Sequence, residues 1–274
     1  MPPLTVRAIR TRSDRNRFIR LQWKMNAHQE QWVPPLLPER RKLMNRKKNP
    51  FFLHSDAEFF IAERDGTAVG RIAAILNANH NREHSEKIGF FGFFECANDP
   101  EVARALFAAA EEWLRAKNVT AVRGPANPSV NDEYGLLVEG FDDTPSVMMP
   151  YNPPYYAGLI EGAGYAKVKD LYSYELHEET FVSEKLARVS AKLMEREAMT
   201  IRPMNMGDFD AEIGRIRELY AAAWQHNWGA VPLTREEFDS LAADLKSIIK
   251  PELVLFAESA GKPVGFALTL PDYN

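Results

Sequence analysis

The sequence contains little cysteine and no long apolar run. Cys96 is the single cysteine among 274 residues, so an internal disulfide is excluded and a reducing compartment is indicated. The most apolar segment, IGFFGFFECA at 88–97, is too short to span a bilayer. The first residues, MPPLTVRAIRTRSD, lack the apolar core of a signal peptide. We therefore expect a soluble, cytoplasmic protein.

The motifs of several enzyme classes are also missing. The sequence has no P-loop and no pattern typical of a nucleophilic triad. One cysteine cannot form a thiolate cluster, and we expect no metal site. Apolar residues at 45% and charged residues at 26% are typical of a globular protein, and the length is sufficient for one large or two ordinary domains.

The net charge of −4 conceals an uneven distribution. Residues 1–48 contain thirteen Lys or Arg against three Asp or Glu, whereas the remainder is strongly acidic. A basic segment can attract phosphates, nucleic acid or an anionic membrane. The simpler interpretation, which we favour, is a solvated helical face. The segment 37–52 could lie on a membrane surface, but Pro38 and Pro50 favour a solvated loop there.

A short pattern occurs twice, at a constant offset of 195 residues. The segment FFIAERDGTAVGRIAAIL at 59–76 matches AESAGKPVGFALTL at 257–270, and TVR at 5–7 matches TIR at 200–202. Two matches at one offset indicate a duplicated folding unit.

The periodicity of the chain predicts the elements of the first copy. They are a strand at 4–10, a helix at 13–28, a hairpin at 58–76, strands at 87–97 and 119–124, a helix from Pro100, a loop at 124–154, a short helix at 155–164 and a closing strand at 165–176. Asp99 is a suitable N-cap for the helix, because Pro100 at its first position loses no required hydrogen bond. An amphipathic connector helix is predicted at 183–199.

This order of elements resembles the GNAT acyltransferase superfamily. The openings TVRAIR and TIRPMNMGDFD, the AE…G…VG hairpin and GAGYAKVKDLYSYEL resemble its first strand, its middle strands and its closing motif. The resemblance implies an α/β (α+β) fold with a mixed central sheet flanked by helices, in a tandem arrangement. It places a first domain at 1–180, a connector at 181–199 and the N-terminal half of an incomplete second domain at 200–274.

The resemblance also implies a reaction. GNAT proteins move an acyl group from acetyl-CoA or a longer acyl-CoA to an amine without a metal. The developing oxyanion is bound by a backbone N–H at a kink in the fourth strand. A glycine-rich turn at a helix N-terminus binds the CoA diphosphate, and a tyrosine on the last helix protonates the departing thiolate.

The first copy departs from this pattern. The turn ECANDPEVAR at 95–104 has no glycine, and its acidic residues oppose a diphosphate. Leu159 stands where the family has its tyrosine, and Tyr155 and Tyr156 lie about one turn earlier. We expect that this copy has lost its CoA site. The positions that correspond to the cofactor contacts are Phe94, Glu95, Cys96 and Asn98.

The second copy stops before a counterpart of the fourth strand, so we expect the catalytic CoA site in a part not included here. The chain as given should then bind acyl-CoA weakly or not at all. A half-domain completed by a partner, through the open edge of PVGFALTL, is the alternative.

Two segments are candidates for binding the acceptor. In the loop 123–156, the candidate residues for binding the acceptor are Asn127, Asn131 and Tyr151. Glu133 is the candidate base there, and Tyr156 is a second candidate catalytic residue. The alternative is a self-packed loop with a core of Phe141, Met148 and Met149.

In the segment 221–234, Trp224 and Trp228 could form apolar walls, with His226 and Asn227 as polar contacts. Both segments could serve one acceptor site, or each could pack on its own copy.

Two functions therefore stay open. The first is an acyl-CoA-dependent N-acyltransferase that acts on a small amine. The second is a non-catalytic GNAT-like module that binds through the basic segment or the 123–156 loop. We expect no nucleic acid partner, and a membrane surface is the less favoured partner.

Overall fold

The computed structural model describes residues 2–177 and 183–274 and divides into two units. Met1–Val168 forms the first unit, together with Trp228–Val231 and Tyr273–Asn274. The second unit comprises Lys169–Asn227 and Pro232–Asp272. No helix in the described ranges is both long enough and apolar enough to cross a membrane.

The first unit is built on a mixed sheet of five strands in the order β1-β2-β3-β4-β5. Neighbouring strands are antiparallel except β4 and β5, which are parallel. The strands are β1 (Leu4–Ala8), β2 (Asp56–Arg64), β3 (Thr67–Leu76), β4 (Ile88–Cys96) and β5 (Ala121–Arg123). A two-stranded ribbon of β6 (Ala126–Asn127) and β7 (Glu133–Tyr134) follows.

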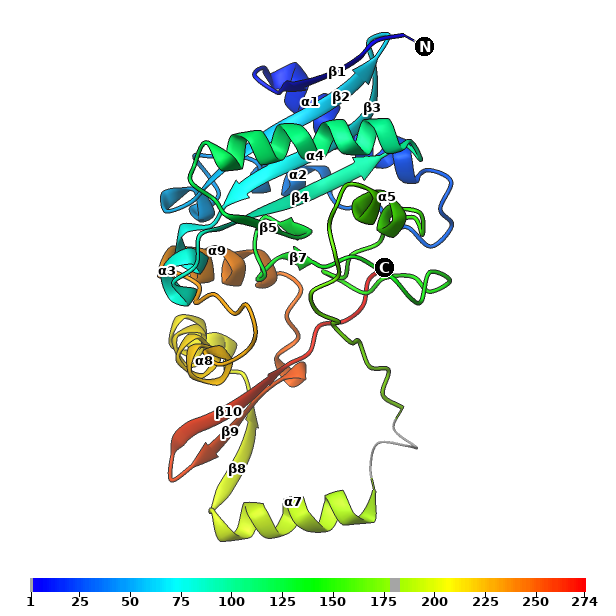
Figure 1. The fold of residues 1–274 in the computed structure, drawn as a ribbon. Helices are drawn as coiled ribbons and strands as arrows, with labels where there is room; N and C mark the ends of the chain where they lie inside the picture. Colours follow the sequence, from blue (N-terminus) through cyan, green and yellow to red (C-terminus); the bar gives the residue numbers. More distant parts are fainter. Residues whose placement is uncertain (1, 178–182) are drawn as a thin grey trace. The chain divides into compact units, whose positions relative to one another are not determined.

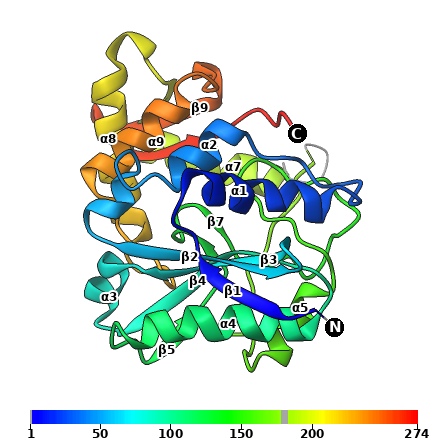
Figure 2. The same ribbon diagram turned by 90° about the horizontal axis from the view of Figure 1, so that it is seen from above.

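Helices cover both faces of this sheet. They are α1 (Arg12–Asn26), α2 (Leu37–Leu43), α3 (Ala78–His84), α4 (Pro100–Arg115) and α5 (Tyr156–Gly162), with a 3-10 turn at Pro50–Leu53. Figure 2 shows α1 on one side of the sheet and α4 on the other. Every residue of β4 is buried, because one core lies between the sheet and α4 and a second lies under α1.

The predicted N-cap of α4 is confirmed. The Asp99 side chain accepts a hydrogen bond from the N–H of Glu101 at 2.9 Å, and Pro100 is the first helical residue. Thr11 caps α1 in a capping box with Asp14. These local signals determine where both helices begin.

The second unit repeats the first three strands. Its strands are β8 (Met199–Pro203), β9 (Val254–Ser259) and β10 (Lys262–Leu268), and its helices are α7 (Glu184–Arg196), α8 (Phe209–Trp224) and α9 (Arg235–Leu245) (Figure 1). β1 pairs with β2 through Thr5–Glu63, Val6–Ala62 and Arg7–Ile61, and β8 pairs with β9 through Thr200–Glu258, Ile201–Ala257 and Arg202–Phe256. Each residue of the second set follows its counterpart by 195 positions.

Irregular features of the hairpin also recur at this offset. The β2–β3 pairing shifts between Ala62 and Glu63, and the β9–β10 pairing shifts between the corresponding residues of the second copy. The turn residues Asp65 and Ala260 both have positive φ, of 50° and 49°. A shared bulge and a shared strained turn residue are hard to explain by chance, so the predicted equivalence of the two hairpins is confirmed.

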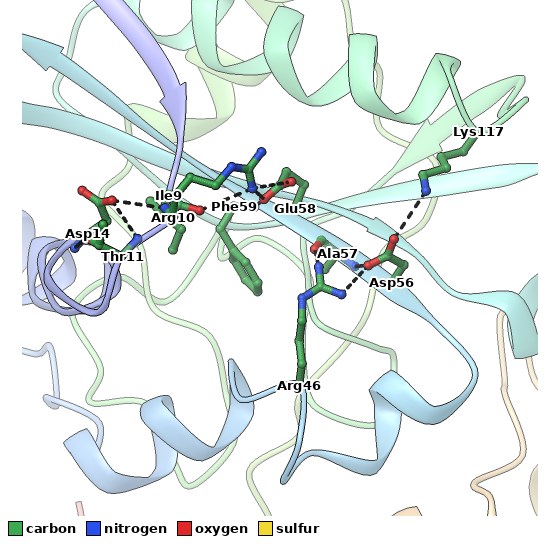
Figure 3. A network of polar contacts seen from close by, with 10 residues as sticks. All are labelled: Ile9, Arg10, Thr11, Asp14, Arg46, Asp56, Ala57, Glu58, Phe59 and Lys117. Carbon is green, nitrogen blue, oxygen red and sulfur yellow. Dashed lines mark hydrogen bonds and ion pairs between the residues drawn. The ribbon is translucent and has the colours of Figure 1, made fainter.

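Cations of the basic N-terminal segment pair with carboxylates of β2 (Figure 3). Arg10 Nη1 lies 2.9 Å from both carboxylate oxygens of Glu58, and Arg46 Nη1 lies 2.6 Å from Asp56. These contacts favour the interpretation of this segment as a solvated structural surface.

Two predictions from the sequence are wrong. The segment 37–43 is the helix α2 rather than a loop, because Pro38 lies in its first turn, where no N–H is required. No strand forms at 165–176, where side chains such as Tyr172 and Tyr174 are exposed. The three-residue β5 has only β4 as a partner among the described strands, so no ladder extends to this segment.

Candidate active site

The fourth strand of the first unit is kinked, at the place where the family resemblance puts its oxyanion donor. The β3–β4 pairing shifts between Arg71 and Ala73, and Phe93 has a positive φ of 49°. The chain crosses β4 closely here, since a Cβ on Gly92 would lie 1.6 Å from the carbonyl oxygen of Ala126. Only glycine permits this approach.

Asn127 connects the kink to a pair of charges. The N–H of Phe93 donates to Asn127 Oδ1 at 2.5 Å, and Asn127 Nδ2 donates to Glu133 Oε2 at 3.1 Å. The other carboxylate oxygen of Glu133 accepts from Arg40 Nη2 at 2.7 Å. The predicted residues Asn127 and Glu133 therefore lie together, and α2 supplies their cation.

A second polar cluster is buried near the end of β4. Glu95 Oε2 accepts from the Tyr156 hydroxyl at 2.7 Å and from Asn26 Nδ2 at 3.1 Å, and Glu95 Oε1 lies 3.3 Å from Arg71 Nη2. Arg71 also donates to the carbonyl oxygen of Phe18 at 2.8 Å, at one end of the cluster. Elements α1, β3, β4 and α5 each contribute one side chain.

Burial changes the acid–base properties of this cluster. It raises the pKa of Glu95, and the positive charge of Arg71 partly opposes that rise. It also raises the pKa of Tyr156 and lowers the pKa of Arg71. A carboxyl group whose pKa is raised exchanges its proton closer to neutral pH, as acid–base catalysis requires.

Several buried polar atoms of these clusters, and one of Gln22 beside Asn26, have no hydrogen-bond partner among the described residues. They are Gln22 Oε1, Asn26 Oδ1, Arg71 Nε and Arg40 Nε. Asn26 and Arg71 are almost fully buried, at 0% and 3% exposed. Unsatisfied buried groups are rare in folded proteins, so these atoms are candidates for contact with a bound polar group.

The backbone N–H groups of the turn before α4 already donate hydrogen bonds to other groups of the protein. The N–H of Cys96 donates to the Tyr156 hydroxyl at 3.0 Å, and that of Ala97 donates to the Val69 carbonyl at 2.9 Å. The Asp99 side chain takes the first N–H groups of the helix, as described above. Arg64 pairs with Asp99 at 3.0 Å. These contacts occupy several N–H groups of the turn, and the expected loss of this cofactor site stays a prediction.

The other predicted cofactor residues differ in accessibility. Phe94 and Cys96 are buried in the core, so their side chains are not available to a ligand. Burial raises the pKa of the Cys96 thiol to about 12, as for an unreactive core cysteine. Asn98 is exposed. A cofactor role for these residues stays a prediction.

Within the long loop, the remaining candidates contact nearby backbone. Tyr151 donates to the Phe141 carbonyl at 3.3 Å. Asn131 Nδ2 donates to the carbonyl of Val231, a residue grouped with the first unit. The apolar core suggested for a self-packed loop is wrong, because Met148 and Met149 are 43% and 49% exposed.

The candidates in the second copy are exposed. Trp224 stacks on Tyr220 with ring centroids 5.4 Å apart, and His226 and Asn227 follow the end of α8. Trp228 is grouped with the first unit, where the Arg123 guanidinium lies 4.9 Å from its ring centroid. A shared acceptor site between the two copies stays a prediction.

Sequence reasoning missed Asn26, Arg40 and Arg71. A charged residue inside the apolar strand VGRIAAIL was the available signal for Arg71. The spacing of His80 and His84 on α3 was also missed, although it can place two ligands on one helix face. His80 instead lies 2.9 Å from Glu86, and the described residues contain no group of three side chains able to hold a metal.

The kinked fourth strand, the mixed sheet and the flanking helices define the fold of a GNAT acyltransferase. A tandem GNAT protein from the clavulanic acid biosynthesis pathway has this fold, with a TM-score of 0.51 over 97% of this chain and 75% of that chain, at 13% identity. No family model matches the sequence.

Two relatives are much more similar in sequence. The bacterial ceramide synthase of Caulobacter vibrioides is 38% identical over 99% of this chain and 71% of its own length. Protein YghO of Escherichia coli is 35% identical over 98% of this chain and 68% of its own length. The chain belongs to the family of these two proteins, and it has the GNAT fold.

Proposed function

We propose that the chain takes part in the transfer of an acyl group from acyl-CoA to the amine of a long-chain amino alcohol. The relative named as a ceramide synthase supports this substrate class, because ceramide is the amide of a fatty acid and such an alcohol. The observation that carries the proposal is the pair of polar clusters, centred on Glu133 and Glu95, beside the kink in β4.

The reaction requires two proton movements. The amine nitrogen attacks the thioester carbonyl carbon, the carbon–sulfur bond breaks, and the products are an amide and the CoA thiol. The amine must lose a proton to a base, and the thiolate must gain one. We assign Glu133 as the base and Tyr156, bonded to buried Glu95, as a group that exchanges a proton.

The contacts of Glu133 bear on this assignment. Both of its oxygens are bonded, one to Arg40 and one to Asn127. An incoming amine would replace the Asn127 amide, which is a neutral donor, rather than the guanidinium. Asn127 would then be free to turn toward the acceptor.

We further propose that the two copies divide the work. The first copy, within 1–180, holds the amine, and the second copy, from 200, binds acyl-CoA, with 181–199 as the connector. The occupied N–H groups in the turn before α4 support this division, because donors that are already bonded within the protein are less available to a diphosphate. A binding module without catalysis is the competing function.

The test uses the protein encoded by the complete reading frame that contains this chain. Initial rates are measured with acyl-CoA and a long-chain amino alcohol, and calorimetry measures the affinity for acyl-CoA. We expect Glu133→Gln to lower kcat about 100-fold and to retain acyl-CoA affinity, since the glutamine keeps its size but cannot take a proton. Exposed Glu139 lies in the same loop, and Glu139→Gln is the matched control.

Two results would contradict the proposal at different levels. Full activity of Glu133→Gln would show that another group is the base. A wild-type protein that binds neither acetyl-CoA nor a long-chain acyl-CoA would remove the enzyme and leave the binding module.

A further inference from the structure

The helix α7 presents an apolar stripe that no part of the described chain covers. Leu186, Val189 and Leu193 recur at intervals of three and four residues and therefore share one face. They are 44%, 52% and 42% exposed. No residue of this helix is buried, so its amphipathic pattern is not explained by packing within the second unit.

A row of cations lies beside this stripe. Lys185, Arg188, Lys192 and Arg196 also recur at intervals of three and four, and the first three each directly precede a residue of the stripe. Arg196 pairs with Glu197 at 2.7 Å. The other three have no ion-pair partner among the described residues, in contrast to Arg10 and Arg46 in the basic N-terminal segment.

We propose that α7 binds an anionic phospholipid surface. Its leucine and valine side chains would enter the acyl boundary, and its lysine and arginine side chains would contact the headgroup phosphates. Charge decides between a membrane and an apolar protein partner. Three cations without an ion-pair partner among the described residues lie along one side of the stripe, although the chain as a whole has a net charge of −4. A basic side next to an apolar face is the pattern of an interfacial helix.

The segment 169–177 of the same unit supports this assignment. Leu171, Tyr172 and Tyr174 are 60%, 74% and 80% exposed. Tyrosine has an apolar ring and a polar hydroxyl, and it is enriched where proteins meet the membrane–water interface. A protein that acylates a long-chain amino alcohol also needs access to a substrate that resides in the bilayer, so this argument rests partly on the proposed function.

Vesicle co-sedimentation without substrate tests the proposal. The probes are vesicles of phosphatidylcholine alone and vesicles that also contain phosphatidylglycerol. We expect the wild type to bind only to the anionic vesicles. The triple variant Lys185→Gln/Arg188→Gln/Lys192→Gln and the double variant Val189→Ser/Leu193→Ser should each bind at least about tenfold more weakly. The control Arg41→Gln/Lys47→Gln/Lys48→Gln removes three exposed cations elsewhere and should retain binding. Circular dichroism checks that each variant is folded.

Three binding results would overturn the proposal. They are the absence of binding to anionic vesicles, equal binding by the α7 variants and the wild type, and equal loss in the control. Self-association of the wild type that Val189→Ser/Leu193→Ser abolishes would also overturn it, because a second copy would then cover the stripe. Vesicle binding is measured without acyl-CoA, so its failure leaves the proposed reaction open, and failure of acylation leaves vesicle binding intact.

Discussion

Tyr156 ties α5 to the end of β4, and the change of Tyr156 to Phe tests how much this contact contributes. The ring of Tyr156 is 1% exposed and packs against Phe94 with centroids 5.2 Å apart. Phenylalanine keeps the ring and removes only the hydroxyl. The measured effect therefore reports the two hydrogen bonds of that oxygen, to Glu95 and from the N–H of Cys96.

The structure predicts a large loss of stability. A hydrogen bond to a buried charged group contributes about 1.5 to 3 kcal/mol, and a buried N–H left without an acceptor costs about 1 to 3 kcal/mol. The two effects share one oxygen and do not add fully, so we expect the free energy of unfolding to fall by about 3 kcal/mol. Tyr155 is the matched control. Its hydroxyl donates to the Cys96 carbonyl at 2.9 Å from a half-buried position, and Tyr155→Phe should cost about 1 kcal/mol.

Urea denaturation followed by circular dichroism measures these changes, with calorimetry to separate the transitions of the two units. A double-mutant cycle of Tyr156→Phe with Glu95→Gln should show coupling between the two side chains. A Tyr156→Phe protein within about 0.5 kcal/mol of the wild type, or no less stable than Tyr155→Phe, would refute the reasoning.

Three further changes test other parts of the first unit. Gly92→Ala should prevent folding or lower the free energy of unfolding by at least about 3 kcal/mol in urea denaturation, because the new Cβ would overlap the carbonyl oxygen of Ala126. The control Gly158→Ala, in the exposed part of α5, should raise it by about 0.5 to 1 kcal/mol. A mild effect of Gly92→Ala would contradict the close approach. Burial lowers the pKa of His80 below its ordinary value of 6.5. Below pH 6.5 the unfolded chain then binds more protons than the folded protein, so the free energy of unfolding should fall as the pH drops through the folded-state pKa of His80. His80→Gln should make the urea midpoint depend less on pH. An unchanged pH dependence in this variant would contradict the role of His80. Arg71→Met leaves Glu95 buried without its cation and should lower the free energy of unfolding by about 3 to 5 kcal/mol, measured by thermal or urea unfolding. The double variant Arg71→Met/Glu95→Leu removes both charges and should be less destabilised.

Local signals in the sequence were sufficient for most of the fold. Asp99 and Pro100 predicted the start of α4, and the repeated pattern predicted two equivalent hairpins, for which the structure adds a shared bulge. The absent strand at 165–176 shows the limit of such signals, because alternation predicts a strand but cannot supply a neighbour to pair with.

The candidate site was only half predictable. Glu133, Asn127 and Tyr156 follow from a polar loop and a family resemblance, and the structure brings each to the region of the β4 strand. Their partners Arg40 and Asn26 are far away in sequence, and only the packing of α1 and α2 on the sheet places them beside these residues. No local pattern carries that information.

The formation of an amide is the most direct test of the central claim. The protein from the complete reading frame is incubated with acyl-CoA and a long-chain amino alcohol, and mass spectrometry and a thiol assay follow the products. The proposed reaction, supported by the similarity to the bacterial ceramide synthase and by the polar clusters beside the β4 kink, predicts one N-acylated amino alcohol for each CoA thiol released. A folded protein that forms no amide with any donor, from acetyl-CoA to long-chain acyl-CoA, would contradict the account.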